Sequence, residues 1–318
     1  MKLYDIYRKA VKTALKNDPR GKAAIGAALK KTKKEFNALK GIEKAAFDRD
    51  RLVHPYDDSR VLFGKKDKEI KTVMVGIDID VQEIVLADRL REKGMGIDLV
   101  ISHHPSGRAF AQLDKVLPVQ PGIWETFGLE KEVAEGVMKG RMEEVFRGIS
   151  PRNHNRAVDA ARLLNMPFMC LHTTADNCVA TYLQKLFNRE KPARLSNVMA
   201  MLRKMPEYRH SIRCTGTGPF ILAGEEKSKA GKIFVDMTGG TNGPDKVFAR
   251  LSQAGVKTVV GMHIKESGYK TVKSEFLNYI VAGHIASDNL GMNLLLDGID
   301  VKNELRVIEC AGFKRVRR

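Results

Sequence analysis

The chain has 318 residues, of which 43% are hydrophobic and 29% are charged. This balance is typical of a globular protein with one large domain or two ordinary ones, and it excludes disordered and fibrous classes. No apolar run approaches the roughly 20 residues needed to cross a bilayer, and the N-terminus lacks the apolar core of a secretory signal. The four cysteines follow no disulfide or zinc-finger spacing: Cys170, Cys178, Cys214 and Cys310. We therefore expect a cytoplasmic protein without a membrane partner.

The net charge of +17 is uneven along the chain. Residues 1–72 contain 20 Lys and Arg against 10 Asp and Glu, a net charge of +10, and the remaining 246 residues carry +7. A basic segment can bind the phosphates of nucleic acid. However, the aromatic residues of this segment form no stacking pattern interleaved with the lysines, as a single-strand binder would need. The solvated face of a helix is the favoured interpretation, and nucleic-acid docking is the alternative.

Two amphipathic helices are predicted near the N-terminus, over residues 2–17 and 27–48, because apolar residues recur there at helical spacing. The intervening Asp18-Pro19-Arg20-Gly21 is a helix breaker. His54–Arg60 is predicted to be a loop with Asp57 and Asp58 at the surface, or alternatively at the lip of a cleft. We expect residues 1–72 to be a basic helical extension that caps an α/β domain formed by residues 73–318.

From residue 73 the pattern alternates between strands and helices. Strands are expected at 73–79, 97–101 and 167–171, with helices at 81–92, at 121–149 inside a helical insertion of about 107–150, and from Pro151 onward. Parallel strands joined by a crossover helix form a βαβ unit. The second half repeats this order, with strands at 232–237, 257–262 and 278–282 and a helix at 244–254. Asp78 and Asp236 end corresponding strands, which predicts an α/β fold whose parallel or mixed sheet is built from duplicated βαβ-type units.

Three histidine-containing segments each follow an apolar, strand-like run. They are Ser102-His103-His104-Pro105, Leu171–Asp176 and Gly283–Asp288. In open α/β sheets, ligands bind beyond the carboxyl ends of the strands, so these segments can converge at one rim. Imidazole combined with carboxylate suits zinc, iron, manganese or cobalt better than calcium or magnesium. The pattern predicts a metal site, with one or two divalent ions.

Each segment also has a structural alternative. Adjacent histidines in extended backbone point in opposite directions, so His103 and His104 share a centre only if the chain turns, which Pro105 permits. A helix that begins near Ile285 places His284 and Asp288 on one face, because residues four apart are neighbours. Asp176 could instead cap the helix that follows it.

Together these motifs resemble the Nif-three-like family, also known as GTP cyclohydrolase I type 2 homologues. The resemblance runs from about Val73 to Asp288 and covers, in order, Val75-Gly76-Ile77-Asp78, the His103-His104-Pro105 segment, His172–Asp176 and Ala282–Asp288. It implies two divalent metal ions held by five ligands: His103, His104, Asp176, His284 and Asp288. His172 would be an alternative ligand or would orient one of the others. The last acid of the family is usually glutamate, which leaves open whether Asp288 bridges both ions or binds one.

The resemblance implies a dinuclear metal-dependent hydrolase that acts on a nucleotide or a related phosphorylated or heterocyclic compound. Asp78 and Glu266 are candidates for the general base, and Lys265 and Arg108 for steering an anionic substrate. The alternative is a metal-binding scaffold or regulatory protein without turnover, which docks on nucleic acid through its basic N-terminal helices. By the same resemblance we expect a homo-oligomer, in the form of a ring built from dimers.

Three further segments are weaker candidates. His263 follows a strand and is either a ligand or a bystander near the cleft. Arg152, His154 and Arg156 open a predicted helix, where they could bind a phosphate or serve only in capping. The glycine-rich turn 238–244 could cradle a phosphate with its backbone amides, although it lacks the Lys-Ser/Thr of a P-loop, and a plain tight turn is the favoured interpretation.

Overall fold

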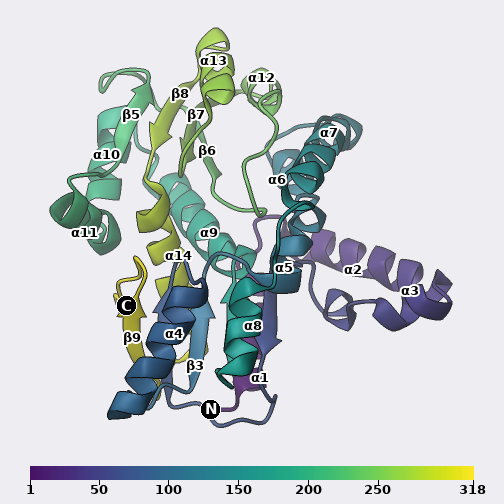
Figure 1. The fold of residues 1–318 in the computed structure, drawn as a ribbon. Helices are drawn as coiled ribbons and strands as arrows, with labels where there is room; N and C mark the ends of the chain where they lie inside the picture. The colour runs from purple at the N-terminus through teal and green to yellow at the C-terminus, as the bar shows by residue number, and fades with distance from the viewer.

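Two mixed sheets form the frame of the molecule, and four strands of the first sheet follow the same order as the four strands of the second (Figure 1). In the computed structural model, which describes residues 1–318, the first sheet has the order β1-β4-β3-β2-β9 and the second the order β5-β8-β7-β6. Strand β1 lies antiparallel to β4, and β5 lies antiparallel to β8. All other neighbouring strands are parallel. The strands are β1 (Ser59–Phe63), β2 (Thr72–Gly76), β3 (Leu99–Ser102), β4 (Phe168–Leu171), β5 (Phe220–Ala223), β6 (Lys232–Asp236), β7 (Val256–Gly261), β8 (Asn278–Val281) and β9 (Arg306–Cys310). The predicted α/β fold with duplicated βαβ units is confirmed.

Two long helices, α9 (Thr173–Glu190) and α14 (His284–Ile299), lie between the sheets and belong to both hydrophobic cores. Leu295 packs with the inner face of the first sheet, whereas Leu290, on the same helix, packs with the second. The two helices contact each other closely, since a Cβ on Gly291 would lie 2.7 Å from the carbonyl oxygen of Ala175. The carboxyl ends of both sets of parallel strands are thereby brought to one region.

The outer face of each sheet has its own helical cover. Successive side chains of β2 point to opposite faces of the sheet. Val73 and Val75 pack toward α9 and α14, whereas Met74 packs toward the outer helices. Helices α4 and α8 cover the first sheet, and α6, α7, α12 and α13 cover the second. Helix α11 packs against α14, and α10 packs against α11 and β5. The bounds are α4 (Val81–Leu90), α5 (Gly107–Ala111), α6 (Val119–Thr126), α7 (Lys131–Ile149), α8 (Arg156–Leu163), α10 (Leu195–Arg203), α11 (Pro206–Thr215), α12 (Val247–Gln253) and α13 (Glu266–Ser274).

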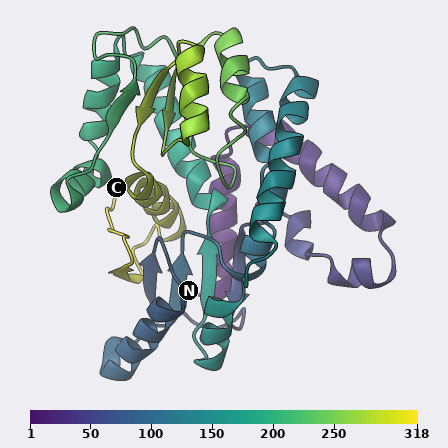
Figure 2. The ribbon, with the colours of Figure 1, turned by 45° about the horizontal axis from the view of Figure 1, so that its top comes forward.

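Residues 1–72 are only partly an added extension. Each sheet with the helices that cover it forms one lobe of the molecule. Helix α1 (Leu3–Lys16) buries its apolar face in the core of the first lobe against α9 and α14, and β1 is a strand of the first sheet. Helices α2 (Gly21–Ala38) and α3 (Gly41–Ala46) form an arm that runs away from the body in both views (Figures 1 and 2). The segment therefore contributes an integral part of the first lobe as well as a projecting part.

Several sequence-based boundaries need correction. The helix expected over 27–48 is broken, because the chain is extended at Leu39 and turns through a positive φ of 51° at Gly41. The helix expected from Pro151 begins only at Arg156, and the one expected from Pro244 begins at Val247. Asp57 and Asp58 are buried rather than at the surface, because they lie beside the buried Arg60 and the end of β4. None of the helices has the combination of length and apolar content that a membrane span requires.

Candidate metal centre

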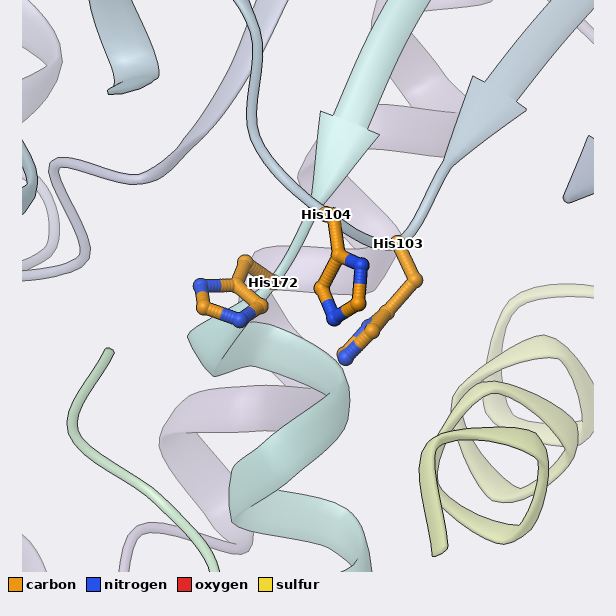
Figure 3. A group of neighbouring side chains, drawn as sticks. All are labelled: His103, His104 and His172. Carbon is orange, nitrogen blue, oxygen red and sulfur yellow. The ribbon is translucent and has the colours of Figure 1, made fainter. Parts of the chain in front are cut away.

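The predicted ligands come together at the carboxyl ends of the strands. Figure 3 shows the rings of His103, His104 and His172 grouped beside the first turn of α9. The chain turns after β3, so both adjacent histidines face the same centre, and their ring centroids are 5.1 Å apart. His284 lies 5.2 Å from His104 between ring centroids. The turn that this arrangement requires is therefore present.

Asp288 lies between two sets of nitrogen donors. Its Oδ1 is 3.4 Å from Nε2 of His103, while its Oδ2 is 3.5 Å from Nε2 of His284 and 3.6 Å from Nε2 of His104. His284 and Asp288 are four residues apart on α14, which is the face-sharing expected from their spacing. Asp176 completes the first set, with Oδ1 at 3.4 Å from Nε2 of His103. Because α9 already begins at Thr173, Asp176 is not its N-cap.

Three groups of donor atoms are close enough to share a metal ion. In each group the atoms lie within 4.8 Å of one another, and the groups are His103, His104 and His172; His104, His284 and Asp288; and His103, Asp176 and Asp288. Tetrahedral coordination with bonds of about 2.1 Å places donors about 3.4 Å apart. The separations around Asp288 match this value.

Unpartnered buried atoms provide a further test of the fit. Both nitrogens of His103, both carboxylate oxygens of Asp288 and Oδ1 of Asp176 are buried without a hydrogen-bond partner. Such atoms lose free energy on folding unless something compensates them. A divalent cation would satisfy most of them at once. The donor set therefore fits one or two metal ions.

Two of the histidines are oriented by carboxylates behind the ring. Nδ1 of His104 is 2.7 Å from Oδ1 of Asp78, and Nδ1 of His172 is 2.9 Å from Oδ2 of Asp58. Each ring then donates from Nδ1 and presents the lone pair of Nε2 to the centre, as histidines that bind metals do. This places Asp78 as a positioning residue and His172 as a potential additional donor.

Asp58 supports the centre from behind His172, although the sequence interpretation favoured the surface for it and kept the lip of a cleft only as the alternative. Its carboxylate also accepts a hydrogen bond from the Thr173 hydroxyl at 2.6 Å, at the start of α9. Burial opposes ionisation of Asp58, but hydrogen bonds from His172 and Thr173 and the charge of Arg60 outweigh it and lower the pKa. Arg60 holds this loop through ion pairs with Asp48 at 2.7 Å and Asp57 at 2.8 Å.

Burial determines the protonation of the centre in the metal-free protein. It lowers the pKa of His103 to about 4 and raises that of Asp176 well above its ordinary value, with the neighbouring Asp288 adding to the second effect. Burial also opposes ionisation of Asp288, yet its pKa is lowered because His103, His284 and His104 surround it. Neutral imidazole beside a carboxylate is the state that binds a metal.

A cavity of about 300 Å³ opens onto the centre. Its lining includes His104, Asp176, His284 and Asp288, together with Asp236 at the end of β6 and the turn that follows. His263 lies at its rim, with its ring centroid 4.7 Å from that of His284, but it belongs to none of the three donor groups. The counterpart relation between Asp78 and Asp236 was the only sequence signal for Asp236.

The other candidate residues lie outside this cavity. Glu266 is exposed at the start of α13 and is 3.8 Å from Lys270. Lys265 pairs with Glu144 at 3.7 Å, and Arg108 pairs with Asp48 at 3.1 Å. Their geometry does not support the predicted general-base and steering roles.

Arg152, His154 and Arg156 line a neighbouring groove, where acidic side chains accompany them. The groove adjoins the cavity at His104 and includes Asp78, Asp80 and Glu83. Nε2 of His154 bonds to the carbonyl of Ile149, the last residue of α7, at 3.0 Å, and no side chain caps the start of α8. The mixed charge of this groove makes it a weaker anion site than the sequence pattern indicates.

The fold agrees with that of a solved structure. A NIF3 superfamily protein from Sphaerobacter thermophilus is 30% identical, covers 80% of this chain and 91% of its own, and has a TM-score of 0.69. This chain belongs to the NIF3 superfamily. Two more distant structures are reduced HcgD from Methanocaldococcus jannaschii (14% identity, 88% and 96% coverage, TM-score 0.47) and a Bacillus cereus protein related to NIF3 (11%, 79% and 90%, 0.40).

No protein-family model and no curated protein sequence matches the chain. The predicted resemblance to the Nif-three-like family is confirmed by the structural match. For this NIF3 superfamily member, the match identifies the family and the fold but no substrate.

Proposed function

We propose that this protein is a cytoplasmic, dinuclear metal-dependent hydrolase that acts on a nucleotide or a related phosphorylated or heterocyclic compound. The observation that carries the proposal is the position of Asp288, whose Oδ1 lies 3.4 Å from His103 while Oδ2 lies 3.5 Å from His284. A carboxylate with its two oxygens directed to separate donor sets is arranged to bridge two cations. Two metals a few ångströms apart are the basis of many hydrolases.

The ligands divide naturally between two positions. His103 and Asp176 would hold one ion, His104 and His284 the other, and Asp288 would bridge them. Each ion would have three protein donors and open positions toward the cavity, which is the arrangement of a catalytic rather than a structural site. Zinc, iron, manganese or cobalt suits these donors, and such ions would polarise a phosphoryl or carbonyl oxygen and activate water.

Among the residues of the chain, Asp236 is best placed as general base. It lines the cavity, its carboxylate has no hydrogen bond to another protein group, and burial raises its pKa to about 6. A base with a pKa near the working pH is the most effective. Asp78 instead holds the His104 ring at 2.7 Å, so its substitution would disturb a ligand.

The test combines metal analysis with a panel of phosphorylated and heterocyclic substrates. We expect two ions per chain and turnover of at least one nucleotide-like compound. His284→Ala should lose most of the metal and the activity while it remains folded. His210→Ala is the matched control, because His210 lies on α11 beside Cys214 and outside the cavity, and it should retain both.

Full metal occupancy in His284→Ala would show that the ligands are assigned wrongly. A fully loaded wild-type protein that turns over nothing in the panel would instead favour the alternative function, a metal-binding scaffold or regulatory protein.

A second candidate function is nucleic-acid docking through the arm formed by α2 and α3. Only Ile25 of these helices is buried, and the arm leaves the body of the protein (Figure 1). It carries Lys22, Lys30, Lys31, Lys33, Lys34, Lys40 and Lys44. Binding to DNA or RNA oligonucleotides, measured by fluorescence anisotropy, should weaken steeply with salt and should require these lysines. Equal binding by a variant with Lys30, Lys31, Lys33 and Lys34 changed to Gln would exclude the arm.

A further inference from the structure

The turn Thr238–Gly243 forms part of the cavity wall and has free backbone donors. Gly240, Thr241 and Asn242 line the cavity that contains the candidate ligands. None of the backbone N–H groups of residues 239–243 donates a hydrogen bond to another protein group. Five successive amides thus lack a protein acceptor, and three of them belong to residues that line the cavity, so they are available to a ligand there.

The carbonyl groups of the same turn are held on the opposite side by the helices of the insertion. The buried Gln120 of α6 donates to the carbonyls of Gly239 and Thr241, and Arg141 of α7 donates to that of Asn242 at 3.0 Å. In a trans peptide, the N–H points opposite to the C=O of the preceding residue. The amides of Gly240, Asn242 and Gly243 are therefore directed away from α6 and α7.

Two glycines let the turn approach Gln120 closely enough for this contact. A Cβ at Gly239 would lie 2.5 Å from Cγ of Gln120, and one at Gly243 would lie 2.8 Å from its Oε1. Helix α12 starts three residues later and has only seven residues, so the donors are those of the turn itself.

Buried, unpartnered carboxylate oxygens on another part of the cavity wall point independently to a ligand. Asp176 is 5% exposed and Asp288 1% exposed, both line the cavity, and their unsatisfied oxygens call for cations. A cavity with cation ligands on one part of its wall and unpartnered amide donors on another suits a compound that carries an oxyanion. A tetrahedral oxyanion can accept from several amides at once, as phosphates do at backbone nests.

We propose that the backbone amides of Gly240, Asn242 and Gly243 bind a phosphoryl group of the substrate, and that Gln120 is the residue that positions them. This inference rests on the proposed function for the two cations, and it adds the substrate class and a binding subsite. Asp236 also lines the cavity and opposes an anion when ionised. The charge of two divalent ions outweighs it, so phosphate binding is expected of the metal-loaded protein.

The experiment is a titration of the metal-loaded protein with inorganic phosphate. Calorimetry measures the affinity, and NMR of ¹⁵N-labelled backbone amides shows which amides are affected. We expect the Gly240, Asn242 and Gly243 resonances to shift on binding. Gln120→Leu, which has a similar volume and no donor, should weaken phosphate binding by about tenfold without changing the metal content. Gln184→Leu is the matched control, because Gln184 bonds the backbone of β6 at Ile233 and Val235 and does not touch the turn. It should bind phosphate as the wild type does.

Phosphate binding that leaves the three amide resonances unshifted would overturn the subsite while leaving the metal proposal intact. Wild-type affinity in Gln120→Leu would exclude Gln120 as the positioning residue. Equal affinity for acetate would show that the turn recognises carboxylates and not phosphoryl groups. Elemental analysis separately measures the metal content of the wild-type protein. A wild-type protein that binds no metal would count against the proposed function.

Discussion

Single side chains at the junction of the two lobes determine what this centre can bind. Asp288 is almost completely buried, and its two oxygens face different histidines. The histidines His104 and His172 are each held by a carboxylate behind the ring, at 2.7 Å and 2.9 Å. The hydrogen bonds of these histidines and the charge of Asp288 therefore orient the donor atoms toward a common centre.

The first prediction concerns the charge of Asp288. Asp288→Asn should reduce the metal content from two ions per chain to one or none, because an amide cannot neutralise two cations as a carboxylate does. Asp288→Glu should retain the metals, since it keeps the charge and adds one methylene to the side chain. Inductively coupled plasma mass spectrometry of the two purified variants measures the outcome. Two ions at full occupancy in Asp288→Asn would contradict the bridging position.

The burial of His54, which is not a candidate metal ligand, predicts that the stability of the protein depends on pH. Its Nδ1 accepts from the Tyr56 amide at 3.2 Å, so Nε2 carries the proton and donates to the Tyr7 hydroxyl at 2.8 Å. Burial lowers the pKa of His54 to about 3, whereas an unfolded histidine has a pKa of about 6.5. Below that unfolded value the unfolded state binds more protons, so stability is lost as the pH falls from about 6.5 toward 3.

The expected contribution of His54 is a decrease in the free energy of unfolding of about 1 kcal/mol for each pH unit below 6. Urea unfolding of the wild type and of His54→Gln at pH 6.5, 5.5 and 4.5 isolates this contribution, because other groups titrate in both proteins. Parallel pH profiles for the two proteins would show that His54 is not buried in the neutral form.

The N-terminal 72 residues form two parts with different structural roles: α1 and β1 belong to the first lobe, and α2 and α3 form a projecting arm. Helix α1 places Leu3, Ile6 and Ala10 in the first core, and β1 brings Asp58 against His172. The arm of α2 and α3 contributes one buried residue, Ile25. The amphipathic pattern of residues 2–17 indicated an apolar face that needs a partner, and the partners are α9 and α14.

Two deletions test this division. Removing residues 28–46 and closing the gap with a Gly-Ser linker should leave the fold and metal content unchanged, because the removed part contributes nothing to either core. Removing residues 1–70 should abolish folding, since it exposes the faces of α9 and α14 that α1 covers. Circular dichroism and elemental analysis check both proteins. A folded, fully loaded protein without residues 1–70 would show that α1 and β1 are dispensable.

The molecule as a whole is held together where its two lobes share helices. Donors on the first lobe, such as His103, and donors on α14, such as His284, meet at one centre. An ion bound by both would link elements that the chain separates by more than a hundred residues. Metal binding and the stability of the native state are then coupled, because the unfolded chain cannot offer these donors together.

Metal loading should therefore raise the melting temperature. At a free metal concentration a thousand times the dissociation constant, the gain is about 4 kcal/mol, or roughly 5–10 °C or more for a chain of this size. Differential scanning calorimetry with zinc and with a chelator measures the difference. Asp288→Asn is the control and should show a much smaller shift. Equal melting temperatures for the loaded and chelated wild type would mean that no ion bridges the lobes.

The amino-acid sequence by itself was sufficient for the local features of this protein. Apolar periodicity located most strands and helices to within a few residues. The histidine segments at strand ends predicted a metal site, and the family resemblance of these motifs named five residues that do converge. The repeated order of strands and helices also indicated the duplicated architecture. These features depend on neighbours along the chain, so a pattern of a few residues contains them.

Only the tertiary structure decided which distant loops share the cavity. Asp58 lies 114 residues from His172 in sequence, and Gln120 lies 119 residues from Gly239. Neither pair follows a spacing rule, because each is brought together by the strand order and by the packing of α9 and α14 between the sheets. The burial of Asp58, the place of Asp236 at the cavity wall and the direction of the turn's amides follow from those long-range contacts, which no local pattern encodes.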